Sequence, residues 1–309
     1  MKTILLFPGI DAIESEQLRK KAIQWPEVVT RIEEAQTILD RAKVSISLKE
    51  VMHSKRQETL EWFSAMVLAA MAVQVGVFDR YSKEGKPIDI LLGMSLGDLA
   101  RSVCAGVSSF SSTFIGLLQF IQQVSSTVGS GSTYQVKLKK READITSFLQ
   151  CENFGVAISV YQSDVSFLVS GPIENLKNWS VVINKLKDVT THELFKIPIP
   201  LHHELLKSVA LSITPYIQKY THFENKNHEI FSSIFGKRLR TSADLNADIV
   251  RNIYSPVNFA HSIHRIMEEG EFVEFINIGP AATMLAFIKQ MDIPRDSYKL
   301  TNYFSYEIH

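Results

Sequence analysis

The sequence predicts an α/β fold in which helices alternate with the strands of a mainly parallel sheet. The prediction begins from three short apolar runs that have the length and composition of buried strands, at residues 3–7, 88–92 and 274–278. Helical periodicity follows each run. The order of elements changes between residues 125 and 197, which predicts a smaller domain inserted into the first. The large domain then comprises residues 1–124 and 198–309.

The amino-acid composition indicates a globular protein and argues against nucleic-acid-binding and membrane proteins. Of the 309 residues, 45% are hydrophobic and 21% are charged, as in ordinary globular proteins. The 33 basic and 33 acidic residues cancel, which argues against a nucleic-acid-binding protein. Cys104 and Cys151 cannot form a disulfide framework and indicate a reducing compartment. No signal peptide is recognised, and no window approaches the roughly 20 apolar residues of a membrane span. We therefore expect a cytoplasmic protein that does not bind membranes.

The first segment of the large domain, residues 1–124, is expected to contain two strands and several helices. The strand at 3–7 ends at Pro8-Gly9, and helical periodicity then covers residues 14–24, 27–43 and 58–76. The last of these helices is apolar nearly all round, which predicts a core helix. After the strand at 88–92, Gly93-Met94-Ser95-Leu96-Gly97 leads directly into a helical pattern that stops at Gly106.

A stretch rich in Ser, Thr and Gly at residues 124–134 is interpreted as the crossing into the small domain. The expected elements after it are a strand, a helix, two strands, a helix and a strand, at residues 134–138, 142–151, 156–161, 165–169, 172–187 and 193–197. This β-α-β-β-α-β order is typical of a ferredoxin-like domain. From Pro198 the chain returns to longer helices, then to the strand at 274–278 and a helix at 282–289.

The pentapeptide around Ser95 has the pattern G-x-S-x-G between a strand and a helix. Its small residues allow a sharp turn that exposes the serine hydroxyl, and the helix N-terminus offers free amides to an oxyanion. This context favours a nucleophile over a plain tight turn.

A nucleophilic serine needs a base, and nine histidines are candidates. His202-His203 follows the extended segment IPIP and precedes a helical pattern, so it lies where a loop can aim a side chain at a site. A surface or capping histidine remains the alternative for either residue. His261 and His264 lie one helical turn apart without a third ligand, so we expect no metal.

With these motifs placed, the sequence resembles the malonyl-CoA:acyl-carrier-protein transacylases, the freestanding (trans-acting) acyltransferases of polyketide synthases and their acyl hydrolase relatives. The shared landmarks are FPG near the start, GMSLGDLARSVCAGV against GHSLGEYSALVCAGV, the small split domain, PLHHELL, IYSPVNF and NIGPAATML. The resemblance implies an α/β-hydrolase-like large domain. It assigns the acylated nucleophile to Ser95, the catalytic imidazole to His202, the main-chain carbonyl that orients it to Asn252, and the oxyanion amides to Leu96 and Ile10.

Departures from the family's pattern concern the acyl group. Phe120 stands where the family carries the arginine that pairs with the malonate carboxylate, and an Arg–carboxylate fork is not replaced by a phenyl ring. Met94 replaces a histidine, residues 9–13 replace a glutamine-rich loop, and Asp98 replaces a glutamate. We expect an uncharged, more apolar acyl group, contacted by Met94, Phe120, Gln119 and His203. The alternative is that Gln119 or Gln122 binds a polar acyl group, or that a cation from elsewhere in the chain does so.

The same resemblance implies an acyl thioester of coenzyme A or phosphopantetheine as donor, an acyl carrier protein as partner, no further cofactor and a monomer. A basic rim is a candidate docking surface for the carrier protein, formed by Lys137, Lys139, Lys140, Arg141, Lys237, Arg238 and Arg240. Two alternatives remain open: a hydrolase of the same fold that clears stalled carrier proteins, and an inactive scaffold that docks them.

Overall fold

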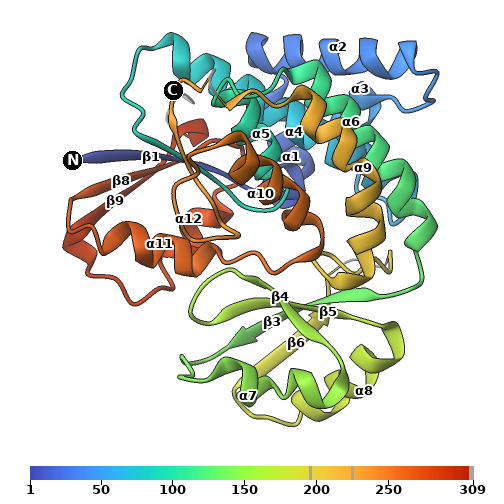
Figure 1. Ribbon diagram of the computed structural model, residues 1–309, viewed down its shortest axis with the longest axis vertical. Coiled ribbons are helices and arrows are strands. Elements are labelled where there is room, and N and C mark those ends of the chain that lie inside the picture. Colours follow the sequence, from blue (N-terminus) through green and yellow to red (C-terminus); the bar gives the residue numbers. More distant parts are fainter. Residues whose placement is uncertain (195–196, 224–225, 306–309) are drawn as a thin grey trace.

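The computed structural model describes residues 1–194, 197–223 and 226–305, and contains two separate sheets (Figure 1). The larger sheet has five strands in the order β7-β2-β1-β8-β9, and all its pairs are parallel. Its strands are β1 (Lys2–Phe7), β2 (Ile90–Gly93), β7 (Glu229–Phe231), β8 (Val273–Asn277) and β9 (Tyr298–Asn302). The predicted parallel sheet is confirmed.

The two edge strands of this sheet were not expected from the sequence. β7 has only three residues, and β9 is the partly exposed segment YKLTN. Apolar runs predict central strands best because those strands are buried on both faces. The three strands that were expected are the three central ones.

Successive side chains of β1 point to opposite faces of the large sheet and so enter two separate hydrophobic clusters. Leu5 and Phe7 pack into a cluster with the helices at the N-terminal end of the chain and α5 and α6. Ile4 and Leu6 face a second cluster that includes α11 and α12. The helices are α1 (Glu16–Ala22), α2 (Pro26–Arg41), α3 (Leu48–His53), α4 (Leu60–Lys83), α5 (Gly97–Cys104), α6 (Phe110–Val124), α9 (Lys207–Tyr220), α10 (Ser242–Tyr254), α11 (Phe259–Met267) and α12 (Thr283–Ile288).

α4 is the predicted core helix, longer than its pattern indicated. The sequence was expected to contain no window as apolar as a membrane span, and this expectation was wrong. By length and composition, Leu60–Lys83 is long and apolar enough to cross a membrane. In the structure, however, 89% of its apolar window is buried inside the protein. Packing against α2, α3 and α5 accounts for its apolar character.

The smaller sheet is antiparallel, in the order β4-β5-β3-β6, and lies at the opposite end of the molecule from α2 (Figure 1). Its elements are β3 (Ser132–Leu138), α7 (Ile145–Leu149), β4 (Ala157–Tyr161), β5 (Ser166–Gly171), α8 (Ile173–Ile183) and β6 (Val189–Glu193). They occur in the expected order around a core of their own that contains Trp179. The last strand lies earlier than the expected 193–197, of which residues 195 and 196 lie outside the described residues.

Candidate active site

Ser95 occupies the turn between β2 and α5, at the carboxyl end of a central strand. Its φ of 59° lies in the left-handed region, which is costly for a residue with a side chain. The flanking glycines make the turn sterically feasible. A Cβ on Gly97 would lie 1.9 Å from the Phe7 main-chain oxygen, and one on Gly93 would overlap Asp98. The sequence therefore forms the strand–turn–helix corner that G-x-S-x-G predicts.

His202 reaches Ser95 from a distant part of the chain. Its Nε2 lies 2.8 Å from Ser95 Oγ, and its Nδ1 hydrogen-bonds the main-chain oxygen of Asn252 in α10. Because a carbonyl oxygen only accepts, Nδ1 carries the proton and Nε2 is left to accept from the serine hydroxyl. The structure thus brings together Ser95, His202 and Asn252 in the order that a serine nucleophile requires.

Burial sets the charge of this histidine. His202 is 7% exposed, and desolvation lowers the pKa of its imidazole to about 4, against the opposing effect of the Asn252 carbonyl. The ring is therefore neutral at neutral pH. A neutral imidazole with a free Nε2 lone pair can take a proton from Ser95.

Leu96 and Ile10 are the two residues expected to supply oxyanion-binding amides. Leu96 is the N-cap residue of α5, and Ile10 begins the short 3-10 helix (Ile10–Ile13) that follows β1. Both residues line the same cavity as Ser95. Within the described part of the chain, neither backbone N–H donates to a protein acceptor. Such unpaired amides can receive a developing oxyanion.

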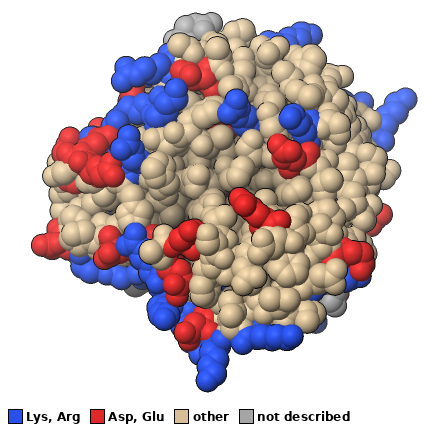
Figure 2. All heavy atoms as spheres, turned by 60° about the horizontal axis from the view of Figure 1, so that its bottom comes forward, with Lys and Arg blue, Asp and Glu red and all other residues tan. Residues whose placement is uncertain are grey.

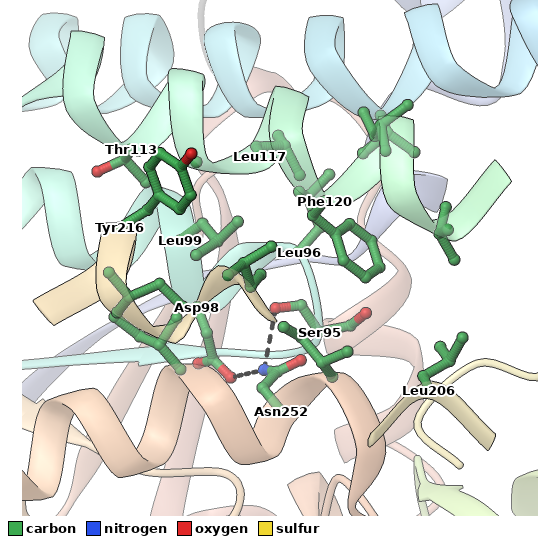
Figure 3. A pocket seen from close by; sticks show the side chains of 18 of the residues that line it. Ser95, Leu96, Asp98, Leu99, Thr113, Leu117, Phe120, Leu206, Tyr216 and Asn252 are labelled. Atoms are coloured by element: carbon green, nitrogen blue, oxygen red, sulfur yellow. Dashed lines mark hydrogen bonds between the residues drawn. The ribbon is translucent and has the colours of Figure 1, made fainter. Parts of the chain in front are cut away.

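A cavity of about 140 Å³ opens beside Ser95, bounded by α4, α5, α6, α9 and α10 (Figure 3). Most of its lining is aliphatic or aromatic, including Phe63, Val67, Leu117, Phe120, Ile121 and Ile213. No lysine or arginine is found among the described residues that line it. The space next to the nucleophile is suited to an uncharged group.

Of the four expected acyl contacts, Phe120 lines the cavity and the other three do not. Met94 packs into the cluster on the opposite face of the large sheet, together with Leu92. Gln119 is not among the described lining residues because the lining positions of α6 fall on another face of that helix, and Gln122 is exposed. His203 accepts a hydrogen bond from Leu205 N at 3.2 Å, and so caps the short helix that begins there.

Sequence reasoning missed a buried charge network beneath the nucleophile. Arg101 is fully buried and lies 2.9 Å from Asp98 Oδ1 and 2.6 Å from Asp248 Oδ2. The first pair has the separation of an ion pair without hydrogen-bond geometry. Burial raises the pKa of the Asp98 carboxyl to about 7, although the Arg101 charge opposes that shift. An arginine inside an otherwise buried helix was the signal available in the sequence.

The expected basic rim also carries acidic groups. Arg141 pairs with Asp292 at 3.1 Å, Lys237 lies 3.7 Å from Asp244, and Arg238 donates to Glu269 at 2.9 Å. The face in Figure 2 likewise shows basic and acidic side chains intermixed at its edge, around a centre that is mostly uncharged. The rim is mixed in charge rather than uniformly basic.

Comparison with known proteins shows the family to which the chain belongs. The model of the acyl transferase domain matches residues 27–293. The chain is 20% identical over 295 residues to the malonyl CoA-acyl carrier protein transacylase of Bacillus subtilis (strain 168), covering 94% of this chain and 90% of the relative. It is 25% identical over 273 residues to probable polyketide synthase 42 of Dictyostelium discoideum, but spans only 10% of that protein's length against 82% of its own.

Solved structures share the fold. A complex of a type II polyketide synthase acyl-carrier protein with its malonyl-transacylase matches with a TM-score of 0.84 at 19% identity, covering 97% of this chain and 95% of the other. The malonyl CoA-acyl carrier protein transacylase of Coxiella burnetii matches with a TM-score of 0.83 at 21% identity, covering 97% and 93%. By its match over most of its length, the chain belongs to the acyl transferase domain family.

Proposed function

We propose that this protein transfers an uncharged, largely apolar acyl group from a thioester, through Ser95, to the thiol of an acyl carrier protein, in a pathway of the polyketide or fatty-acid type. The observation that carries the proposal is the cavity beside Ser95, which Phe120 lines and to which no described residue contributes a cationic side chain. A carboxylate on the acyl chain would lie unpaired there, at a cost of several kcal/mol.

In the first half-reaction, His202 Nε2 takes the proton of Ser95 Oγ as the oxygen attacks the thioester carbon. The amides of Leu96 and Ile10 hold the oxyanion of the tetrahedral intermediate. The carbon–sulfur bond then breaks, and His202 returns the proton to the departing thiolate. Acyl-Ser95 and a free thiol result.

In the second half-reaction, the carrier-protein thiol gives its proton to His202 and attacks the acyl-serine carbon. The carbon–oxygen bond breaks, and Ser95 regains the proton from His202. The Asn252 carbonyl keeps Nδ1 protonated in both halves, so that Nε2 exchanges the proton each time. One imidazole therefore serves as base and acid in turn.

We also assign residues 1–124 and 198–309 to an α/β-hydrolase-like large domain and residues 125–197 to a ferredoxin-like small domain. The separate core around Trp179 and the antiparallel pairing of β3, β4, β5 and β6 support this division.

Intact mass spectrometry tests the proposal. The protein is incubated with malonyl-, acetyl-, hexanoyl- and benzoyl-coenzyme A, with Ser95→Ala as the matched control. We expect stable adducts from the uncharged donors, none from malonyl-coenzyme A, and none on Ser95→Ala. Rapid, stable malonylation of Ser95 would show that the acyl group is charged.

The fate of the acyl-serine separates the proposal from its rivals. Adding a holo carrier protein to the isolated acyl-enzyme should move the adduct to the carrier thiol faster than water releases it. Release at the same rate with or without the carrier would instead identify a hydrolase. A Ser95→Ala variant that fully supports the pathway would identify a scaffold.

A further inference from the structure

Asn252 contacts two parts of the site, one through its main chain and one through its side chain, whose hydrogen bonds to Asp98 and Ser95 are drawn in Figure 3. Its main-chain oxygen accepts a hydrogen bond from His202 Nδ1–H. Its side-chain Nδ2 donates to the Asp98 carboxylate and, at 3.2 Å, to the Ser95 main-chain oxygen. One residue thus links the orientation of the imidazole to the turn that carries the nucleophile.

Asp98 is the buried acceptor of this arrangement. It is 1% exposed, lies in the first turn of α5, and also accepts from Ser233 Oγ at 3.1 Å. Its other oxygen lies 2.9 Å from Arg101, whose guanidinium also donates to the Phe231 main-chain oxygen at 2.7 Å. The surroundings hold the Asp98 carboxylate in one place, with one oxygen directed at Asn252.

We propose that Asp98 is a positioning residue, which holds the side chain of Asn252 and through it the main-chain carbonyl that directs His202 Nε2 at Ser95. The inference rests on the proposed function, because it requires Ser95 and His202 to act as a pair. Asp98 touches neither imidazole nor serine hydroxyl in this role. It acts by fixing α10 relative to the turn before α5.

Asp248 provides a matched control. It lies one helical turn before Asn252 in α10, is fully buried, and pairs with the same Arg101 at 2.6 Å. Its other oxygen accepts from Ser232 rather than from Asn252. Removing either carboxylate charge leaves Arg101 with one charged partner, so a purely structural role predicts similar losses from both positions. A positioning role predicts a larger loss at Asp98.

The test uses a fluorophosphonate, which modifies a serine only when its hydroxyl is activated and so needs no knowledge of the acyl group. Labelling rates of Ser95 are followed by intact mass for the wild type, Asp98→Asn, Asp248→Asn, Asn252→Ala and the double variant Asp98→Asn/Asn252→Ala. Melting temperatures are recorded alongside. Asn252→Ala keeps the main-chain carbonyl and removes only the side-chain amide.

We expect Asp98→Asn and Asn252→Ala each to lower the maximal labelling rate of Ser95 about 10- to 100-fold, because small misplacements of reacting groups have effects of this size. The probe concentration that gives half the maximal rate should change little. The double variant should be no slower than the slower single variant, because both remove one interaction. Asp98→Glu should label faster than Asp98→Asn. Asp248→Asn should lose less than about threefold beyond what reduced stability explains.

Equal rate losses in Asp98→Asn and Asp248→Asn, or additive losses in the double variant, would overturn the positioning role and leave the proposed function intact. If Asp98→Asn does not fold, Asn252→Ala alone decides, and an unchanged rate in it overturns the inference. A wild-type protein that resists labelling contradicts the dyad itself and therefore both proposals.

Discussion

Ser95 and His202 face each other across 2.8 Å from two backbone positions that both have positive φ, 59° and 52°. Among the described residues only two others outside glycine share this feature, Lys43 and Gln150. A left-handed backbone costs about 1 to 3 kcal/mol at such positions and persists where the surroundings enforce it. Both members of the pair are therefore presented to each other by strained turns.

The adjacent residues His202 and His203 have different roles, because only His202 hydrogen-bonds Ser95. His202→Gln should lower the fluorophosphonate labelling rate of Ser95 by about 10²- to 10⁴-fold, since it removes the base. His203→Gln is the matched control, because that side chain caps a helix and does not line the cavity; its rate should stay close to the wild-type rate. Equal losses in the two variants would contradict the assignment of His202, and labelling is measured by intact mass.

The glycine after the nucleophile carries a steric prediction. Gly97→Ala places a carbon 1.9 Å from the Phe7 main-chain oxygen, so β1 or α5 must shift. We expect the free energy of unfolding to fall by about 1 to 3 kcal/mol or more in chemical denaturation. Gly116→Ala in α6 meets nothing within 4 Å and should be neutral or slightly stabilising. Equal stability of the two variants would show that the turn is not tightly packed.

Local patterns in the sequence were sufficient to predict most of this architecture. The central strands and the turn at Ser95 follow from apolar runs and glycine spacing, and the pairing of His202 with Ser95 followed from the family resemblance. The edge strands escaped because β7 is three residues long and β9 is partly polar, so neither has the pattern of a strand buried on both faces.

The errors within the site have another cause. Whether a side chain points into the cavity depends on the rotation of its helix and the parity of its strand, which a single motif does not specify. Gln119 and Met94 adjoin the right positions in the sequence but face away from the cavity. The Asp98–Arg101–Asp248 network joins α5 to α10, and its two carboxylates are 150 residues apart in the sequence. Only the fold brings them together, so no local pattern predicts the network.

The buried imidazole has a consequence for pH. The pKa of His202 is lowered from 6.5 to about 4 by desolvation, so between these values the unfolded chain holds a proton that the folded chain has released. The contribution of His202 therefore makes the folded state more stable as pH rises through this window. Nuclear magnetic resonance titration of the ring should find its midpoint well below 6.5.

Labelling rates give a second check on that titration. Protonation of His202 should not slow labelling between pH 8 and pH 6. A fall in this range would instead report the Asp98 carboxyl, whose pKa burial raises to about 7 beside Arg101 and Asp248. Such a fall should disappear in Asp98→Asn. If it persists there, the imidazole is not shifted as described.

The size of the cavity can be altered at a single position. Gly116 lines the cavity, and a side chain added there meets no atom within 4 Å of its Cβ position. Gly116→Leu should therefore project into the acyl space without moving the backbone, and shorten the longest acyl group that Ser95 accepts. The ratio of hexanoyl to acetyl adducts, measured by intact mass in competition, should fall relative to the wild type. An unchanged ratio would place the acyl chain elsewhere.

Charge selection by the acyl cavity is tested at Phe120, which lines the same cavity as Ser95 (Figure 3). Phe120→Arg introduces a guanidinium that can pair with a carboxylate in two parallel hydrogen bonds. The variant should gain malonylation of Ser95 from malonyl-coenzyme A and lose adducts from apolar donors. Gln119→Arg adds the same charge at the adjacent residue, which does not line the cavity, and should leave the preference unchanged. If both variants gain malonylation equally, general attraction of the anionic donor explains the gain; if neither does, the acyl group does not approach Phe120.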